Sequence, residues 1–353
     1  MTLTGEPLLE FRSSPFQHWR VTPAQGVGHS ELILVHGLGE HAGRMMPLAR
    51  RFAAMGYRCR VPDLPGHGAN GEDSHHAVVK AYLKGRDASE VNDLIQKLPP
   101  SLITEAKQIA ANKHQQLFRT TFEEIIEQVE KLTLWSAIDG TQARVPHHVW
   151  GHSLGGRAAF HAVSRIDRDQ CCAPTSLVLG SAAFSPPTTV DDVLKKLFIG
   201  QAYLLSSISF LRPFAALQRL FLQLLRVDGD GRFANEYVSD LPDERLLHST
   251  DPLQNHQIPL CFAGRLLPWM ARARKVARTL RTPVLIFAPG FDPIVNTTGS
   301  RAVAASLPVS IDDRRPQRLD IHESMKVHDL VRSSCAEAII SRVHSWMKGD
   351  LCH

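Results

Sequence analysis

Gly151-His152-Ser153-Leu154-Gly155-Gly156 is the stretch from which the architecture is best inferred. Residues 145–150 are short, partly apolar and β-favouring, and residues 157–165 carry alanines and apolar residues at helical spacing. The sequence therefore predicts a strand, a sharp turn and a helix. In that setting Gly-x-Ser-x-Gly holds a serine on a strained turn, with its hydroxyl exposed at the carboxyl end of a sheet. Taken alone, the pattern also fits an ordinary strand-to-helix turn.

The composition is that of a folded protein with a substantial core. The 353 residues are 43% hydrophobic and 21% charged, with room for one large α/β domain with insertions or for two domains. The net charge of +5 is not gathered into a basic run, so we expect no nucleic-acid partner. Six scattered cysteines and an amino terminus without a signal-peptide pattern favour a cytoplasmic location. No oligomeric state is predicted.

A second glycine loop follows the first clear strand. Residues 31–35 form an apolar run that predicts a buried strand and leads into His36-Gly37-Leu38-Gly39-Glu40-His41. A helix over residues 45–55 and a strand over residues 58–64 complete a unit that predicts a parallel sheet. An oxyanion beside a nucleophile needs backbone donors. The N–H groups of Leu38 and Leu154 are candidates for this role, with a plain turn as the alternative for the first.

Three motifs in this order resemble those of a known family. They are His36-Gly37-Leu38-Gly39-Glu40-His41 with Gly43-Arg44, then Asp63-Leu64-Pro65-Gly66-His67-Gly68, then Gly151-His152-Ser153-Leu154-Gly155-Gly156. Together they are similar to the serial signatures of the monoacylglycerol lipase and lysophospholipase group of α/β-hydrolases, from which Met45 and Ala69 depart. The resemblance implies an α/β-hydrolase fold: a mostly parallel sheet flanked by helices, with an inserted helical cap. It also implies a serine hydrolase that acts on acyl-lipid esters without a cofactor.

The expected domains are a hydrolase core of residues 1–184 and 281–353 and a cap of residues 185–280. The stretch between Gly68 and Gly151 is longer than in the resembled family. Helical patterning broken at Pro99-Pro100 predicts an inserted helical hairpin over about residues 70–119. This hairpin either shields the active site, binds a partner or forms a solvated surface element, and its many charges favour the last.

The most apolar segment of the chain, residues 193–225, falls in the expected cap. A membrane-spanning helix is disfavoured because Arg212 and Pro213 would lie within it. The segment instead predicts an apolar wall for an acyl chain, although the same side chains could simply pack the cap onto the core. Peripheral membrane contact through the cap is a further expectation. The candidate wall residues are Leu204, Leu205, Phe210, Phe214, Leu217 and Phe221.

The remaining catalytic groups are expected late in the chain. Hydrolases with this serine turn run in the order serine, acid, histidine. Asp292 follows a predicted strand over residues 283–287 and has the expected place, with Asp312 and Asp313 as alternatives in a polar turn. By resemblance to the family, His328 is the base, with His322 as the alternative. The sequence contains no His-Glu-x-x-His, so no metal site is expected.

These residues predict one reaction and leave several substrates open. Ser153 would attack an ester carbonyl, His328 would accept and return the proton, and Asp292 would orient the imidazole. Asp251-Pro252-Leu253 and residues 260–267 resemble the end of the cap in monoacylglycerol lipases, which favours monoacylglycerols as substrates. A lysophospholipase and a general carboxylesterase are alternatives. An acyltransferase with the same triad and a non-catalytic lipid-binding protein are functions of other classes.

Overall fold

The computed structural model describes residues 6–13, 17–24, 28–69, 71–138, 146–167, 172–185, 235–256, 259–309 and 312–350. Within these ranges a single sheet of eight strands forms the centre, in the order β1-β2-β4-β3-β5-β6-β7-β8. The strands from β4 to β8 run parallel, while β1 and β2 are antiparallel additions at one edge. The strands are β1 Leu8–Arg12, β2 His18–Thr22, β3 Ser30–Val35, β4 Tyr57–Val61, β5 His147–His152, β6 Ser176–Gly180, β7 Val284–Pro289 and β8 Arg318–His322.

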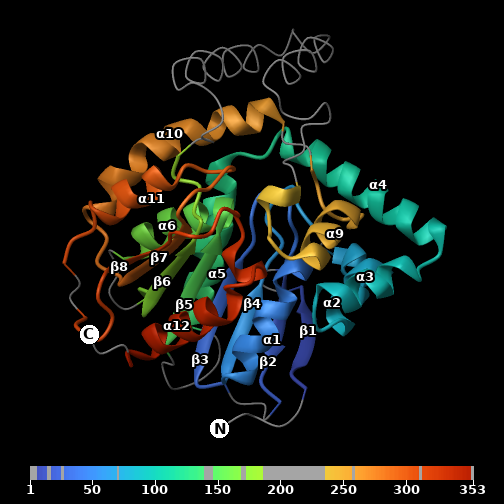
Figure 1. Cartoon of the computed structure of the whole chain (residues 1–353), viewed down its shortest axis with the longest axis horizontal. Helices are drawn as coiled ribbons and strands as arrows, with labels where there is room; N and C mark the ends of the chain where they lie inside the picture. The colour runs from blue at the N-terminus through green and yellow to red at the C-terminus, as the bar shows by residue number, and fades with distance from the viewer. Residues whose placement is uncertain are drawn as a thin grey trace.

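Helices cover both faces of this sheet (Figure 1). Helices α1 (Met46–Ala54) and α12 (Ala336–Lys348) pack in one apolar cluster with Trp150 and Val178. Helices α5 (Phe122–Ile138), α6 (Ser153–Ile166), α10 (Leu260–Ala277) and α11 (Thr297–Ala304) share the other cluster with Val149 and Leu177. Neighbouring residues of a strand point to opposite faces, so Val149 and Trp150 of β5, like Leu177 and Val178 of β6, contribute to different layers. This arrangement confirms the predicted α/β-hydrolase fold class.

The predicted insertion consists of three α-helices and not of a two-helix hairpin. They are α2 (Ala77–Lys84), α3 (Ala88–Gln96) and α4 (Pro100–Leu117), preceded by the short helix η2 (Gly71–His75). The first arm of the predicted hairpin is divided into two helices, because α2 ends at Lys84 and Gly85 follows it. Gly85 packs closely against α3: a Cβ at this position would lie 2.5 Å from Cγ2 of Val91. Asp87 then caps α3 by accepting a hydrogen bond from the N–H of Glu90 at 2.9 Å.

Two other segments depart from the sequence-based expectation. The helical pattern of residues 269–280 predicts a helix there, but α10 begins at Leu260, continues through Pro268 and ends at Ala277. The edge strands β1 and β2 were not predicted, because β1 is short and half-exposed and has no continuous apolar run. Helix α9 (Pro242–Thr250) and the short helices η1 (Ala42–Met45), η4 (Asn235–Tyr237) and η5 (Leu330–Arg332) complete the described elements.

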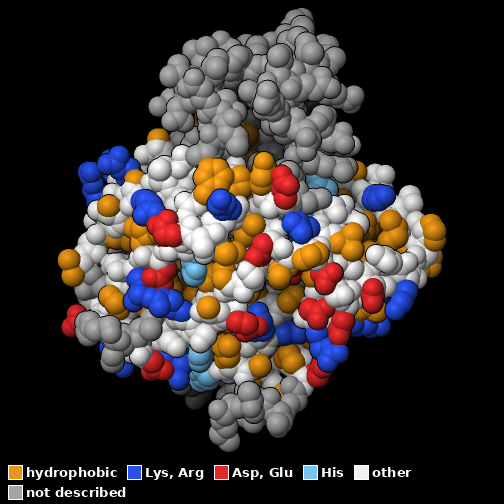
Figure 2. All heavy atoms as spheres, viewed as in Figure 1, with side chains coloured by type: hydrophobic (Ala, Val, Ile, Leu, Met, Phe, Trp, Pro, Cys, Tyr) orange, Lys and Arg blue, Asp and Glu red, His pale blue; other side chains and the backbone are white. Residues whose placement is uncertain are grey.

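Charged side chains of both signs are mixed on the face of the molecule that Figure 2 shows. Figure 2 shows Lys and Arg interspersed with Asp and Glu over the face drawn, without a large area of one sign. None of the helices within the described ranges combines the length and the apolarity that crossing a bilayer requires.

Candidate active site

Ser153 lies at the junction of β5 and α6 in a backbone conformation that non-glycine residues seldom adopt. Its φ is +51°, in the left-handed region, and such strain persists only where the surrounding structure enforces it. A Cβ at Gly155 would lie 2.3 Å from the carbonyl oxygen of His36, and one at Gly151 would lie 2.4 Å from the carbonyl oxygen of Gly155. The helix therefore packs directly against the end of β3, which fixes the serine at the carboxyl end of the sheet.

Asp292 and His328 form a buried hydrogen-bonded pair. Nδ1 of His328 lies 2.8 Å from Oδ2 of Asp292. The other carboxylate oxygen accepts from the N–H groups of Ile294 at 2.8 Å and Val295 at 3.0 Å. Burial alone would lower the pKa of His328, but the charge and hydrogen bond of Asp292 outweigh it, so the pKa is raised. The aspartate thus orients the imidazole with Nδ1 protonated and leaves Nε2 for other chemistry.

The alternative residues lie elsewhere. His322 is within β8, and its carbonyl oxygen accepts from the N–H of Gly290 at 2.9 Å. Asp312 pairs with Arg315 at 2.6 Å in a turn before β8. Of the two histidines, His328 is the one that lines a cavity together with Ser153.

That cavity has a volume of about 210 Å³ and is lined by both apolar and polar side chains. Leu38 and Leu154, the expected oxyanion donors, both line it. The first N–H groups of an α-helix have no partner within the helix, so the N–H of Leu154 is available to an oxyanion. The apolar wall residues are Ala183, Val238, Ala263, Leu266, Leu267, Met270, Ile294 and Val295, and the polar lining residues include Glu40, His152, His248, Gln254 and Asp329.

A buried charged network, which the sequence analysis missed, joins the loops around the cavity. Nη1 of Arg332 lies 2.5 Å from Oε1 of Glu40 and also donates to Asp329. Glu40 accepts from the N–H of Gly37 at 2.8 Å, and Asp329 lies 3.8 Å from Nε2 of His152. Burial alone would raise the pKa of Glu40, but Arg332, His152 and other donors hold it well below its ordinary value. The network connects the glycine loop with the residues that adjoin the serine and the histidine.

The same network bears on metal binding. Ligand atoms of Glu40, His152 and Asp329 lie within 4.8 Å of one another, which is close enough to surround a cation. The Arg332 guanidinium contacts both carboxylates and already supplies the positive charge. These residues therefore fit an internal ion-pair network better than a metal site.

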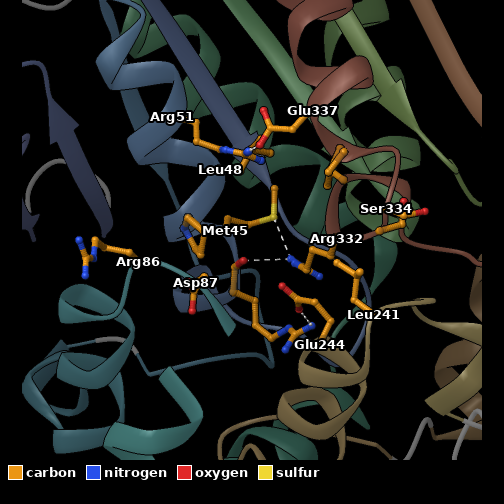
Figure 3. Close-up of a pocket in the computed structure, with 15 residues that line it drawn as sticks. Met45, Leu48, Arg51, Arg86, Asp87, Leu241, Glu244, Arg332, Ser334 and Glu337 are labelled. Carbon is orange, nitrogen blue, oxygen red and sulfur yellow. Dashed lines mark hydrogen bonds and ion pairs between the residues drawn. The ribbon is translucent and has the colours of Figure 1, made fainter. Parts of the chain in front are cut away.

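A second cavity of about 390 Å³ lies beside Arg332 (Figure 3). Its arginines have acidic partners: Arg51 pairs with Glu337, and Nη2 of Arg44 lies 3.5 Å from Glu244. This balance of charge gives the second cavity no preference for an anion or a cation. The strained serine, the histidine and the apolar wall all belong to the first cavity, which is the candidate active site.

The structure does not test the apolar wall that the sequence predicts for the cap. Leu204, Leu205, Phe210, Phe214, Leu217 and Phe221 lie outside the described residues. Within the described residues, α10 and the segment after Asp292 provide apolar side chains to the cavity instead. For the charged network, the sequence contained one signal, the spacing of Asp329 and Arg332. No sequence pattern linked either residue to Glu40.

Comparison with known proteins gives a family match over most of the chain. Residues 28–103 and 112–318 match the family described as Hydrolase_4, serine aminopeptidase, S33. A monoacylglycerol lipase from Mycolicibacterium smegmatis is 24% identical over 326 residues, which cover 91% of this chain and 88% of that protein. The monoacylglycerol lipase structure from Paleococcus ferrophilus has the same fold, with a TM-score of 0.61 at 20% identity, covering 95% of this chain and 99% of that one.

A further relative is much longer than this chain. An uncharacterized abhydrolase domain-containing protein from Dictyostelium discoideum is 24% identical over 316 residues, or 89% of this chain. The match spans only about a quarter (26%) of that relative's length.

Proposed function

Since the chain belongs to the Hydrolase_4 family, described as serine aminopeptidase S33, we propose that it is a serine hydrolase that cleaves carboxylic esters of acyl lipids, chiefly monoacylglycerols. The observation that carries the proposal is the Asp292–His328 hydrogen bond of 2.8 Å beside a cavity that His328 shares with the strained Ser153. The apolar wall of this cavity favours an acyl chain over a peptide.

The proposed reaction proceeds through an acyl-enzyme. Oγ of Ser153 attacks the ester carbonyl carbon while Nε2 of His328 accepts its proton. The N–H groups of Leu38 and Leu154 stabilise the oxyanion of the tetrahedral intermediate. His328 then protonates the departing alcohol, and water, activated by the same imidazole, releases the fatty acid. Asp292 stabilises the imidazolium form in both steps.

Two polar side chains that line the cavity support a glycerol headgroup over a phosphate-bearing one. Oε1 of Gln254 and Oδ1 of Asp329 are buried and have no hydrogen-bond partner among the described residues. Both atoms are acceptors, so each is best satisfied by a hydroxyl donor of the substrate. A phosphate diester offers only acceptors and a negative charge, which the Asp329 and Glu40 carboxylates would repel. The predicted order is therefore monoacylglycerol first and lysophospholipid second.

The test is a substrate panel with purified protein. We expect turnover of p-nitrophenyl esters with medium or long acyl chains, and faster release of fatty acid from monoolein than from lysophosphatidylcholine. Ser153→Ala should lower these rates by about 10⁶, as in the subtilisin case. Aminoacyl p-nitroanilides test the aminopeptidase activity in the family's description, and an added alcohol acceptor tests acyl transfer. Activity on short esters alone would contradict the acyl-lipid assignment, and an active Ser153→Ala variant would contradict the nucleophile.

The same helix that lines the cavity supports a peripheral membrane contact. Arg272, Arg274 and Lys275 are exposed on α10, as is Arg278 directly after it, and Leu266 and Met270 of this helix line the cavity. Basic side chains attract anionic headgroups, so a cytoplasmic enzyme of this kind would meet its lipid at a membrane surface. Co-sedimentation with vesicles that contain phosphatidylserine should exceed that with neutral vesicles, and equal recovery with both would contradict the contact.

A further inference from the structure

The inserted helices α2, α3 and α4 contact the polar side of the active site without lining its cavity. No residue of these three helices is among the described residues around the cavity. Each helix nevertheless contributes a polar side chain to the segment 243–255, which includes the cavity residues His248 and Gln254. Tyr82 of α2 donates to Asp251, Asn92 of α3 donates to the carbonyl oxygen of Asp243 at 3.1 Å, and His114 of α4 lies 2.9 Å from the amide nitrogen of Asn255. Figure 1 shows α9 beside α2 and α3.

Tyr82 is connected to the glycine loop of residues 37–41 through two successive contacts, from Tyr82 to Asp251 and from Asp251 to His41. Oδ2 of Asp251 lies 2.7 Å from Nε2 of His41 and also accepts from the Tyr82 hydroxyl. All three side chains are buried. The rings of Tyr82 and His41 meet edge to face, with centroids 4.9 Å apart. Gly43 lies under this pair, and a Cβ there would be 2.7 Å from Cε1 of His41. The carboxylate is held in its charged form: although burial opposes it, His41 and Tyr82 lower the pKa of Asp251 to about 2.

The same segment also holds the middle of the loop. The N–H of Asn255 donates to the carbonyl oxygen of Gly39 at 2.7 Å. Gly39 has a φ of +77°, and a Cβ there would lie 2.1 Å from the carbonyl oxygen of Asn255. This glycine directly follows Leu38, the proposed second oxyanion donor. The loop is therefore fixed against residues 251–255, and those residues are fixed by the insertion.

From these contacts we propose that the inserted helices hold the oxyanion loop in place, and that Tyr82 is a positioning residue that acts through Asp251 and His41. The inference rests on the proposed function, because it concerns the oxyanion donor Leu38. A donor stabilises the transition state only when it lies 2.7–3.1 Å from the developing oxyanion. A small displacement of the loop would therefore slow the chemical step while leaving the binding of the ground-state ester unchanged.

The test is Tyr82→Phe, which removes only the hydroxyl. Because complete loss of an oxyanion donor lowers kcat by about 10²–10³, we expect its displacement to lower kcat by about tenfold, with KM unchanged. The rate of inactivation by a fluorophosphonate should fall by the same factor, since phosphonylation uses the same donors. Tyr57→Phe is the matched control. Tyr57 lies on β4, away from the loop, and its hydroxyl lies 3.2 Å from Nδ1 of His344. This control should lose stability but keep kcat.

A second measurement is independent of turnover. In Tyr82→Phe we expect faster amide hydrogen exchange in a peptide spanning residues 36–46, and in Tyr57→Phe we expect no change there. The double variant Tyr82→Phe/Asp251→Asn should be no slower than Asp251→Asn alone, because both act through one carboxylate.

Several results would overturn the inference. They are a kcat for Tyr82→Phe within about twofold of the wild type, a change in KM alone, additive effects in the double variant, and unchanged exchange of the loop. Inactivity of the wild type on every ester would instead count against the proposed function, and the exchange measurement would still decide whether the insertion holds the loop.

Discussion

Replacing Arg332 with methionine would leave two buried carboxylates without their shared counter-charge. Nη1 of Arg332 contacts both Glu40 and Asp329, and Nη2 donates to the carbonyl oxygen of Arg44 at 3.1 Å. Glu40 is 6% exposed and Asp329 is 1% exposed, so water cannot replace the guanidinium fully. Breaking a buried ion pair by removing one partner costs about 3–5 kcal/mol of unfolding free energy. We expect a loss of this size for Arg332→Met at neutral pH.

The loss should depend on pH in a defined direction. Glu40 has a lowered pKa in the folded wild type, so its contribution to stability is present above its unfolded pKa and is lost as the pH falls through the folded value. In the variant the dominant remaining influence on Glu40 is burial, which raises its pKa. The variant therefore regains stability by protonating Glu40 as the pH is lowered. The difference between wild type and variant should be larger at about pH 7.5 than at about pH 5.

Urea unfolding at these two pH values measures the effect. Arg301→Met is the matched control, because Arg301 pairs with Glu323 at 2.8 Å while the two side chains are 48% and 70% exposed. An exposed pair contributes at most about 1 kcal/mol, so this control should change little at either pH. The reasoning would be refuted if Arg332→Met lost no more than Arg301→Met, or if its loss were the same at both pH values.

Four further outcomes can be measured with the same enzyme. The raised pKa of His328 places the acid limb of the kcat/KM profile above about pH 6.5, with activity lost as the pH falls through that limb. Asp292→Asn should lower kcat by about 10⁴ and move the limb to lower pH, as expected when the imidazole loses its orienting charge; an unmoved limb would exclude Asp292 from this role. His328→Ala should abolish ester hydrolysis while His322→Ala retains it, and the opposite assay result would make His322 the base. Gly155→Ala should reduce stability by about 1–3 kcal/mol and inactivate the enzyme, because its Cβ would lie 2.3 Å from a carbonyl oxygen at the end of β3; an active variant of normal urea midpoint would show that the helix can move away.

The central strands could be predicted because each carries its own signal. β7 and residues 32–35 of β3 are continuous apolar runs, and the structure buries every residue of both strands. The edge strand β1 lacks such a run, and its Leu8 is 64% exposed. What defines β1 is its pairing with β2, in which Phe11 lies opposite Trp19. Pairing between segments is a tertiary property that a local pattern does not contain.

The insertion contained a signal that the sequence analysis did not use. Asp87 and Glu90 have the spacing of a helix capping box, and Oε2 of Glu90 accepts a hydrogen bond from the N–H of Arg86 at 3.0 Å. Together with Gly85 they mark a helix end and a new helix start. The hairpin prediction instead relied on Pro99-Pro100 as the only break.

Some residues of the candidate site could be predicted from local sequence patterns, whereas others are brought together by contacts between distant parts of the chain. Ser153 and Leu154 were predicted from one hexapeptide, and Asp292 from chain order after a strand. The pairing of Glu40 with Arg332 joins residues 292 positions apart in the chain, and neither residue lies in a pattern that refers to the other.

The loop of residues 37–41 shows why these long-range contacts matter for function. Arg332 holds Glu40, Asn255 holds Gly39, and Asp251 holds His41. None of these three partners belongs to the central sheet. Because the strands are stabilised by apolar burial, losing the contact of Asn255 or Asp251 leaves the sheet intact and moves only the loop. Arg332 differs, because its loss also leaves two buried carboxylates without a counter-charge and lowers the free energy of unfolding. Substitutions at Asn255 and Asp251 should therefore reduce turnover before they reduce folding, whereas substitutions in β3 or β7 should do the reverse.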